Sequence, residues 1–161
     1  WVLSMPFDSQ DSPEIAYILG KQRLNMNELD EALPLLQSAF KRVPTEQKYA
    51  LDLAEAYYRK KDYGGVKGTV LTFVEDPAEP RFLLLMAESC RALGQMPDAI
   101  SMYKTYLNRF GTNMTVLNSL ADCLVSVGSN EEALALYEKS LQMDQNQPKI
   151  KERIKSLKEK K

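Results

Sequence analysis

The amino-acid sequence predicts an all-α protein made of four successive helical hairpins and a closing helix. Apolar residues recur at the three- and four-residue spacing of amphipathic helices along most of the chain. Glycine or asparagine interrupts these stretches at regular places, as expected where one helix turns into the next. A small or β-branched residue inside each leucine-rich stretch recurs at intervals of 34, 33 and 34 residues, at Ala32, Val66, Ala99 and Ala133.

This period divides the chain into six segments. An irregular segment over residues 1–12 is expected first, and a basic closing helix over residues 148–161 last. Between them we expect four repeats, over residues 13–46, 47–79, 80–113 and 114–147. Each repeat is a short helical hairpin that cannot bury its apolar face alone, so stacking of neighbouring repeats is expected to form a continuous core.

In the first repeat, two apolar series predict two helices. One contains Ile15, Leu19 and Leu24, and the other runs from Leu29 through Leu33 and Leu36 to Phe40. Residues 25–27 separate them, and Asn27 is expected to cap the second helix. Pro34 lies inside that second helix, where it is expected to bend the helix or shift its start.

In the second repeat, three glycines fall within the predicted second helix, at Gly64, Gly65 and Gly68. Each costs up to about 1 kcal/mol relative to alanine in a helix interior. Two interpretations stay open: close packing between adjacent hairpins requires small residues here, or the glycines form a flexible joint.

In the third and fourth repeats, Gly94 and Gly128 mark the turns between helices. Ser129 and Glu132 have the spacing of a capping box, in which each side chain bonds the other's backbone N–H. Cys90 and Cys123 form no disulfide framework and are expected to be buried as small hydrophobic residues.

The closing helix carries Ile150, Ile154 and Leu157 on one face and basic residues elsewhere. A repeat array needs a terminal element with a polar outer face, so this helix is interpreted as a solubilising cap. A contact with nucleic acid or an acidic membrane is the alternative. Residues 1–148 are net acidic, which argues against nucleic acid as a partner.

The first seven residues, Trp1 to Phe7, are apolar and do not join the repeat. They are expected to pack on the first hairpin. Docking into the groove of a neighbouring copy and the remnant of a removed segment, such as a membrane anchor, are the alternatives. The missing initial Met indicates a fragment or a processed chain.

Further residues that recur in the units give a family resemblance. An apolar residue precedes a small one at Leu19-Gly20, Leu53-Ala54, Met86-Ala87 and Leu120-Ala121, and Pro44 and Pro77 close the first two units. With the recurring small residue and the apolar positions after it, the pattern resembles the tetratricopeptide repeat. The family's tryptophan is absent from all four units, at Ala16, Ala50, Leu83 and Leu117. The resemblance implies a right-handed α-solenoid of helix-turn-helix hairpins with a C-terminal capping helix.

The resemblance also implies a concave groove lined by the first helices of the hairpins. Carried over residue by residue, the groove positions are Tyr17, Ile18, Lys21, Lys48, Leu51, Asp52, Glu55, Arg81, Leu84, Leu85, Glu88, Asn118 and Asp122. We expect three leucines among them to be exposed anchors for a partner: Leu51, Leu84 and Leu85. The alternative is that they pack between hairpins.

The composition of this groove indicates what kind of partner it binds. Chaperone-binding members of the family hold a carboxylate tail with Lys, Asn and Arg, whereas this chain has Lys21, Asp52 and Leu85 at three of those positions. Binding of such tails is therefore disfavoured, because acidic groove residues repel them. A protein or peptide with apolar anchors and one or two basic residues is expected instead.

These patterns predict a non-catalytic protein–protein interaction module that acts as an adaptor or scaffold. The chain has no His, no phosphate loop and no nucleophile elbow, so an enzyme, a metal site and a cofactor are not expected. The alternatives are a self-assembling structural module, through exchange of the N-terminal segment or array stacking, and a secretion-type chaperone. No segment is apolar enough to span a bilayer. We expect a cytoplasmic protein, with a periplasmic or membrane-tethered parent protein as the alternative.

Overall fold

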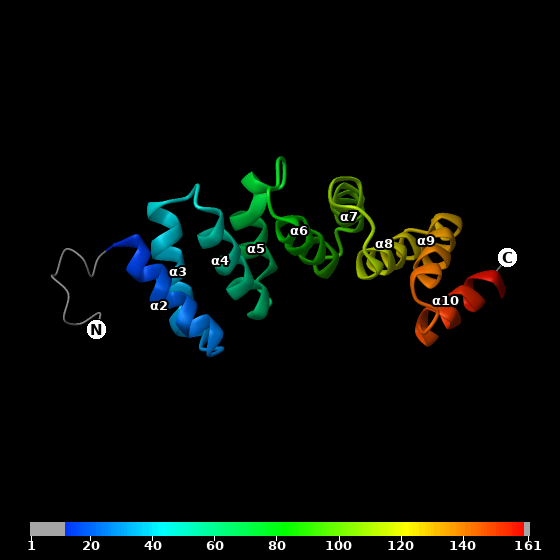
Figure 1. Ribbon diagram of the computed structural model, residues 1–161, viewed down its shortest axis with the longest axis horizontal. Coiled ribbons are helices and arrows are strands. Elements are labelled where there is room, and N and C mark those ends of the chain that lie inside the picture. Colours follow the sequence, from blue (N-terminus) through cyan, green and yellow to red (C-terminus); the bar gives the residue numbers. More distant parts are fainter. Residues whose placement is uncertain (1–11, 160–161) are drawn as a thin grey trace. The chain divides into compact units, whose positions relative to one another are not determined.

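The computed structural model describes residues 12–159, and within this range all regular structure is helical. This confirms the all-α fold class. The helices, labelled in Figure 1, are α2 (Pro13–Asn25), α3 (Leu29–Arg42), α4 (Gln47–Arg59), α5 (Tyr63–Val70), the 3₁₀ turn η2 (Leu71–Phe73), α6 (Pro80–Ala92), α7 (Met96–Phe110), α8 (Met114–Ser126), α9 (Asn130–Met143) and α10 (Pro148–Glu159).

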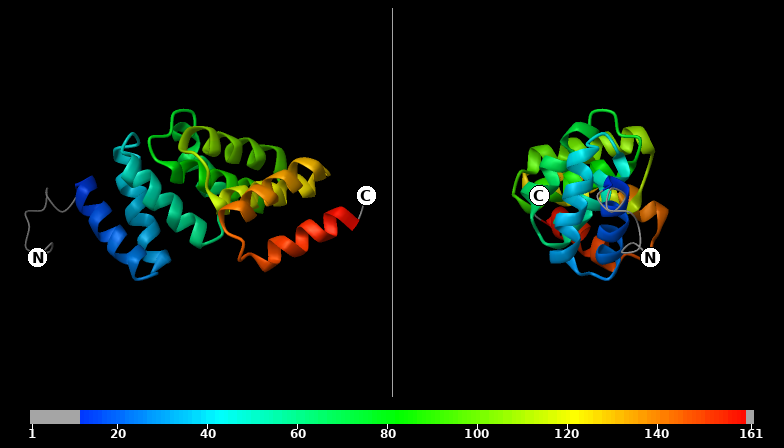
Figure 2. Two further views of the ribbon diagram at one scale, coloured as in Figure 1. Left: turned by 45° about the vertical axis from the view of Figure 1, so that its right-hand side comes forward. Right: turned by 90° about the vertical axis from the view of Figure 1, so that its left-hand side faces the viewer.

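The chain divides into two compact units, the first ending at Ser89 and the second beginning at Cys90, inside α6. In the first unit, α2 packs against α3, α3 against α4, and α4 against α5. Figures 1 and 2 show these four helices as antiparallel neighbours. In the second unit, α7 packs on α8, α8 on α9, and α9 on α10. Each unit therefore consists of helices that contact mainly their neighbours in sequence, as in a repeat array.

The core of the first unit forms where two hairpins meet. Leu24 of α2, Ala32 and Leu36 of α3, and Leu53 and Ala56 of α4 form one buried cluster. At Gly20 of α2, a Cβ atom would lie only 2.9 Å from Cγ of Leu36, which is closer than real Cβ contacts. The absence of a side chain at Gly20 thus lets α2 and α3 approach closely.

Side chains cap three helices at their N-termini. Ser12 Oγ accepts a hydrogen bond from the backbone N–H of Ile15 at 3.2 Å. Asp62 caps α5 and Asn113 caps α8 in the same way, through the N–H groups of Gly65 and Val116. Ser12 thus serves the first helix as its N-cap, although the sequence assigned it to an irregular segment. The rest of that segment, residues 1–11, lies outside the described residues. The expectation that it packs on the first hairpin concerns these residues and stays a prediction.

Two capping predictions were wrong. Asn27 does not cap α3: its φ of 61° places it in the left-handed region at the end of α2, and Glu28 is the N-cap residue. Asparagine tolerates this conformation better than most residues, which explains its place in the turn. Ser129 is the N-cap residue of α9 but makes no capping hydrogen bond with its side chain. Its expected partner, Glu132, instead pairs with Lys104 of α7 at 2.8 Å.

Pro34 lies well inside α3, which nevertheless begins at Leu29, so the proline does not shift the start of the helix. The glycine turns predicted at Gly94 and Gly128 are confirmed, since both residues have φ values in the left-handed region, 74° and 81°.

The glycines of α5 differ from one another in their surroundings. A Cβ at Gly65 would lie 2.6 Å from Cδ1 of Tyr57 in α4, so close packing accounts for this glycine, although within one hairpin and not between adjacent hairpins. A Cβ at Gly64 would have only an ordinary contact, and one at Gly68 would meet nothing within 4 Å. Packing therefore explains one of the three glycines, and the other two weaken α5 without a steric need.

This difference predicts opposite effects of alanine at two positions of one helix. Gly68→Ala should raise the free energy of unfolding by about 0.5 to 1 kcal/mol, because alanine favours the helix and its methyl group meets no atom. Gly65→Ala should lower it, because the methyl group overlaps the Tyr57 ring. Urea denaturation followed by circular dichroism measures both. Equal effects of the two substitutions would contradict this account of α5.

The second unit is built around buried aromatic and aliphatic side chains. Tyr103 of α7, Leu117 of α8 and Tyr137 of α9 each have 1% of their surface exposed. The apolar face of α10 is buried against this unit through Ile150, Ile154 and Leu157. Cys90 and Cys123 are buried and not joined in a disulfide, as predicted. Among the described helices, none combines the length and apolar character needed to cross a membrane.

Candidate functional site

In the first unit, the predicted groove residues lie on three helices, α2, α4 and α6. We call the side of these helices that carries them the first-helix face. It comprises Tyr17, Ile18 and Lys21 of α2, Lys48, Leu51, Asp52 and Glu55 of α4, and Arg81, Leu84, Leu85 and Glu88 of α6. Asn118 and Asp122 belong to α8 of the second unit.

Three of these side chains bind one another between α2 and α4. The hydroxyl of Tyr17 donates a hydrogen bond to Oδ2 of Asp52 at 2.6 Å. Nζ of Lys21 lies 2.9 Å from the same carboxylate oxygen and donates to the Tyr17 hydroxyl at 3.0 Å. Burial and the hydrogen bond to Asp52 raise the pKa of Tyr17, and the bonds to Tyr17 and Asp52 raise the pKa of Lys21. The neutral tyrosine and the charged lysine are thus the forms that this arrangement favours.

Aromatic rings lie beside this group. The rings of Tyr17 and Tyr49 have centroids 4.5 Å apart. Nζ of Lys48 lies 5.4 Å from the Tyr49 centroid and 5.8 Å from that of Tyr17, within the range of cation–π attraction. Lys48 is therefore placed over an aromatic pair at the exposed edge of the first-helix face.

A pocket of about 240 Å³ opens between α4 and α6. Its lining comes from both helices and comprises Glu55, Tyr58, Arg81, Leu84, Leu85 and Glu88. Five of these six are predicted groove residues. Tyr58 was missed, although it lies three residues after Glu55 and so shares its side of the helix. Glu55 accepts from Nε of Arg59 at 2.8 Å and lies 3.5 Å from Arg81.

The expectation that all three leucines are exposed was wrong for two of them. Leu51 and Leu85 each have only 8% of their surface exposed, whereas Leu84 is partly exposed. Helical spacing identifies the side of a helix but not how much of each side chain the packing leaves exposed. Leu85 still contributes to the pocket wall. On α2, Ile18 is the exposed aliphatic residue, with 55% of its surface accessible.

In the second unit, both predicted groove residues are engaged within the fold. Asp122 accepts a hydrogen bond from the Tyr137 hydroxyl and pairs with Arg153 of α10. Nδ2 of Asn118 donates to Oε1 of Gln147 at 2.8 Å. Burial raises the pKa of Tyr137 to about 12, so it stays a hydrogen-bond donor throughout the physiological range. Asp122 and Asn118 thus connect α8 to α9, α10 and the segment between them.

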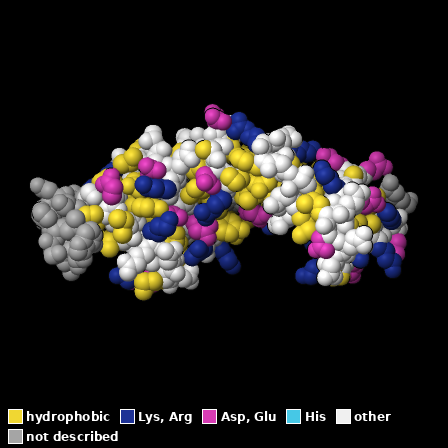
Figure 3. Space-filling view, viewed as in Figure 1, with side chains coloured by type: hydrophobic (Ala, Val, Ile, Leu, Met, Phe, Trp, Pro, Cys, Tyr) yellow, Lys and Arg dark blue, Asp and Glu magenta, His cyan; other side chains and the backbone are white. Residues whose placement is uncertain are grey.

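A common arrangement links these interactions. The ninth position of all four predicted repeats is charged, and in three of them, at Lys21, Glu55 and Asp122, it pairs with an oppositely charged residue on the following first helix or on α10. The partners are Asp52, Arg81 and Arg153, respectively. These charged side chains, which the sequence predicted to contact a partner, therefore form ion pairs within their own unit. In the third repeat the position is Glu88, which lines the pocket between α4 and α6. Figure 3 shows hydrophobic side chains interspersed with charged groups of both signs over α2 to α6.

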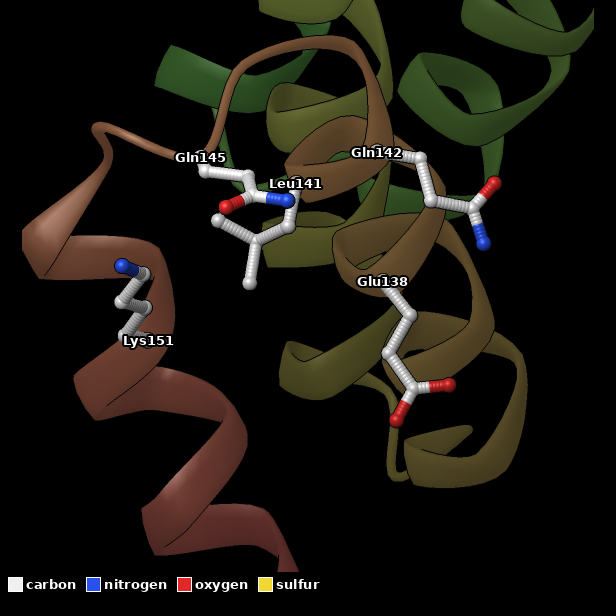
Figure 4. Close-up of a pocket in the computed structure, with 5 residues that line it drawn as sticks. All are labelled: Glu138, Leu141, Gln142, Gln145 and Lys151. Carbon is white, nitrogen blue, oxygen red and sulfur yellow. The ribbon is translucent and has the colours of Figure 1, made fainter.

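A second pocket, of about 270 Å³, lies between α9 and α10 and is drawn in Figure 4. Lys151 of α10 lies across from Leu141 and Gln145, while Glu138 and Gln142 project from α9. Glu138 pairs with Lys158 of α10 at 2.9 Å. The sequence predicted none of these residues as a site. Their mixed polar lining gives no indication of a specific ligand.

Comparisons with known proteins agree with the helical repeat. The profile of the tetratricopeptide repeat family matches residues 17–65 and 84–148. Tetratricopeptide repeat protein 21A of Mus musculus is 27% identical over 135 residues, which make up 83% of this chain and 10% of that protein. This chain thus spans about a tenth of the length of that relative.

Solved structures show the same fold. A crystal structure of MamA protein has a TM-score of 0.85, with 16% identity, over 91% of this chain and 81% of the other. MamA from Desulfovibrio magneticus RS-1 has a TM-score of 0.77, with 16% identity, over 87% and 80% of the two chains. At this identity the likeness concerns the fold alone, an α-solenoid of helical hairpins.

Proposed function

This chain belongs to the tetratricopeptide repeat family, and on that basis we propose that it binds a peptide or helix of a partner protein along its first-helix face. Family membership supports a protein–protein interaction or scaffold module. The binding surface, the chemistry of the partner and the absence of catalysis are the proposed parts. The chain acts as an adaptor or scaffold within a larger assembly.

The observation that carries this proposal is the pocket between α4 and α6. Its wall combines the partly exposed Leu84 with Leu85 and Tyr58, so an aliphatic side chain of a partner gains apolar contacts there. Helix-in-groove and extended peptides both use such anchor pockets. The exposed Ile18 on α2 offers a further apolar contact on the same face of the unit.

The rim of the pocket favours a partner with one or two basic residues. Glu55 and Glu88 contribute carboxylates, and Arg81, half of whose side chain is exposed, lies 3.5 Å from Glu55. A basic residue of the partner can replace Arg81 beside Glu55, so that one ion pair is exchanged for another. Such an exchange contributes little net affinity but specifies the partner, whereas the apolar anchor supplies most of the binding free energy.

A random peptide library selected on the immobilised chain tests the proposal. Peptides with an aliphatic residue flanked by Lys or Arg should be enriched. Leu84→Glu should weaken their binding by about tenfold or more, because it places a charge in the anchor pocket. Leu71→Glu is the matched control, since Leu71 is 61% exposed and lies outside the first-helix face. Circular dichroism establishes that both variants fold.

Equal binding to wild type and Leu84→Glu would reject the first-helix face as the site. Enrichment of acidic peptides would be consistent with the first-helix face as the site, but would contradict the proposal that the partner is basic. The alternative of self-assembly has two routes, array stacking and exchange of the N-terminal segment, and the second depends on the apolar residues Trp1 to Phe7, which lie outside the described residues. Light scattering of the chain with and without residues 1–11 tests it, and this deletion keeps Ser12, the cap of α2.

A further inference from the structure

The second unit carries a basic helix beside the pocket between α9 and α10. This helix, α10, contains five basic residues and two acidic ones. Its apolar face is buried through Ile150, Ile154 and Leu157, so the basic residues lie along its exposed sides. The lining of the pocket alone indicates no specific ligand, but the charges around it indicate a class of ligand.

Three lysines of α10 lie on the side of the helix that borders the pocket. Lys151, Lys155 and Lys158 follow one another at intervals of four and three residues, which places them on one side of a helix. Lys158 pairs with Glu138 of α9 at 2.9 Å, and Lys151 lines the pocket itself. This side of α10 therefore presents a row of ammonium groups along the space between the two helices.

The lysines of this row differ in whether their charge is already compensated. Lys158 has Glu138 as its partner, and Lys155 lies 3.8 Å from Glu159 of its own helix, with 77% of its side chain exposed. Among residues 12–159, Lys151 has no hydrogen-bond or ion-pair partner. A carboxylate that binds Lys151 therefore breaks no existing ion pair, whereas one that binds Lys158 must displace Glu138.

The rest of the pocket offers an apolar surface and an amide group. The side chain of Leu141 is partly buried and projects into the space between α9 and α10, as Figure 4 shows. Gln145 borders the same pocket, is exposed, and has no hydrogen-bond partner in the part of the chain that the structure describes. Its amide carries donors and an acceptor, so it can bond the main chain of an extended peptide.

We propose that the pocket between α9 and α10 binds an extended segment of a partner protein that carries acidic residues beside an apolar one. The apolar residue packs on Leu141, and the acidic side chains pair with Lys151 and Lys155. Alternate side chains of an extended segment are about 6.8 Å apart, and Lys151 and Lys155 are about 6 Å apart along their helix. Leucine, glutamate and glutamate at every second position of the segment therefore match the pocket.

The site differs from the first-helix face in the charge of its ligand. The pocket between α4 and α6 is lined by Glu55 and Glu88, whereas the pocket between α9 and α10 has the ammonium group of Lys151. The two pockets share no residue and lie in different units, so neither proposal depends on the other. An acidic peptide that binds Leu84→Glu as tightly as wild type would belong to the pocket between α9 and α10.

Fluorescence anisotropy of a labelled peptide tests the proposal on the 161-residue chain. The probe has the pattern leucine-x-glutamate-x-glutamate, with serine at x and at both flanks. Lys151→Glu should weaken its binding by about tenfold or more, because this change removes an attractive charge and adds a repulsive one. Replacing leucine by serine, or both glutamates by glutamine, in the probe should also weaken binding.

Lys149→Glu is the matched control. It makes the same change of charge at an exposed position of α10, two residues from Lys151 and outside the pocket lining. At about 0.15 M salt, where charges more than about 8 Å apart are largely screened, it should weaken binding by less than about twofold. Leu84→Glu should leave binding of the probe unchanged. Circular dichroism establishes that the variants fold.

Four outcomes would overturn the proposal. Equal weakening by Lys149→Glu and Lys151→Glu would mean that the probe responds to the charge of α10 as a whole. Equal binding of the serine-for-leucine peptide would mean that Leu141 provides no anchor, and equal binding of the glutamine peptide that the lysines do not select carboxylates. An oligouridine RNA that binds more tightly than the probe, and that Lys151→Glu releases, would assign the lysines to nucleic acid.

Discussion

Replacing Leu36 with alanine lowers the free energy of unfolding by about 3 to 5 kcal/mol, the cost of removing three carbon atoms from a rigid core. Leu36 has no exposed surface and lies in the cluster that joins α2, α3 and α4. Its Cγ also lies where Gly20 brings the backbone of α2 close, so the surrounding helices are already in tight contact and cannot collapse far into the cavity.

Urea denaturation followed by circular dichroism measures this effect. Leu71→Ala makes the same chemical change at a leucine that is 61% exposed, and should alter stability by less than about 0.5 kcal/mol. A loss of stability at Leu36 as small as that at Leu71 would mean that this cluster does not hold the first two hairpins together.

Gln147→Ala should destabilise the second unit by about 2 to 4 kcal/mol, because it removes three hydrogen bonds that join α8, the end of α9 and the segment before α10. Nε2 of Gln147 donates to the backbone oxygens of Ser140 at 3.0 Å and Asp144 at 2.9 Å. Its Oε1 accepts from Asn118, whose own Oδ1 is buried without a hydrogen-bond partner. One amide group thus connects α8, the end of α9 and the residue before α10.

Gln145→Ala is the control, since Gln145 lies two residues away with its side chain exposed. It should change stability by less than about 0.5 kcal/mol. Thermal unfolding of the two variants measures the difference. If both variants unfold at the wild-type temperature, the connection through Gln147 contributes nothing, and the apolar face of α10 alone holds this helix in place.

The repeat was predictable from the sequence because its period depends on residues that pack. Ala32, Val66, Ala99 and Ala133 recur at intervals of 33 or 34 residues, and all four are fully buried. The closing helix was predictable for the same reason, since its three apolar residues are spaced along one face and all become buried. Apolar periodicity identifies the buried side of a helix whatever the neighbouring hairpin contains.

Helix ends were less predictable, because several nearby residues compete to form the cap. Ser12, Asn27 and Ser129 are all residue types that cap helices. Only the backbone conformation decides between them, and it places Ser12 at a cap, Asn27 in a left-handed turn, and Ser129 at a cap that makes no side-chain bond.

The candidate site was predictable in location but not in its interactions. Five of the six residues lining the pocket between α4 and α6 were identified from their places in the repeat. The ion pairs of Lys21, Glu55 and Asp122 were not, because each joins residues about thirty positions apart on different helices. The burial of Leu51 and Leu85 was not predictable either, because helical spacing does not determine how much of a side chain the packing leaves exposed.

The pairing of Asp122 with Arg153 provides a rule for redesigning this array. Arg153 lies on the helix that closes the second unit, and it bonds both Asp122 and the Tyr137 hydroxyl. A graft that replaces α10 with the first helix of an additional consensus repeat must therefore supply an arginine or lysine at the equivalent place. With that residue the junction keeps its native hydrogen bonds, and the engineered array can be lengthened one hairpin at a time.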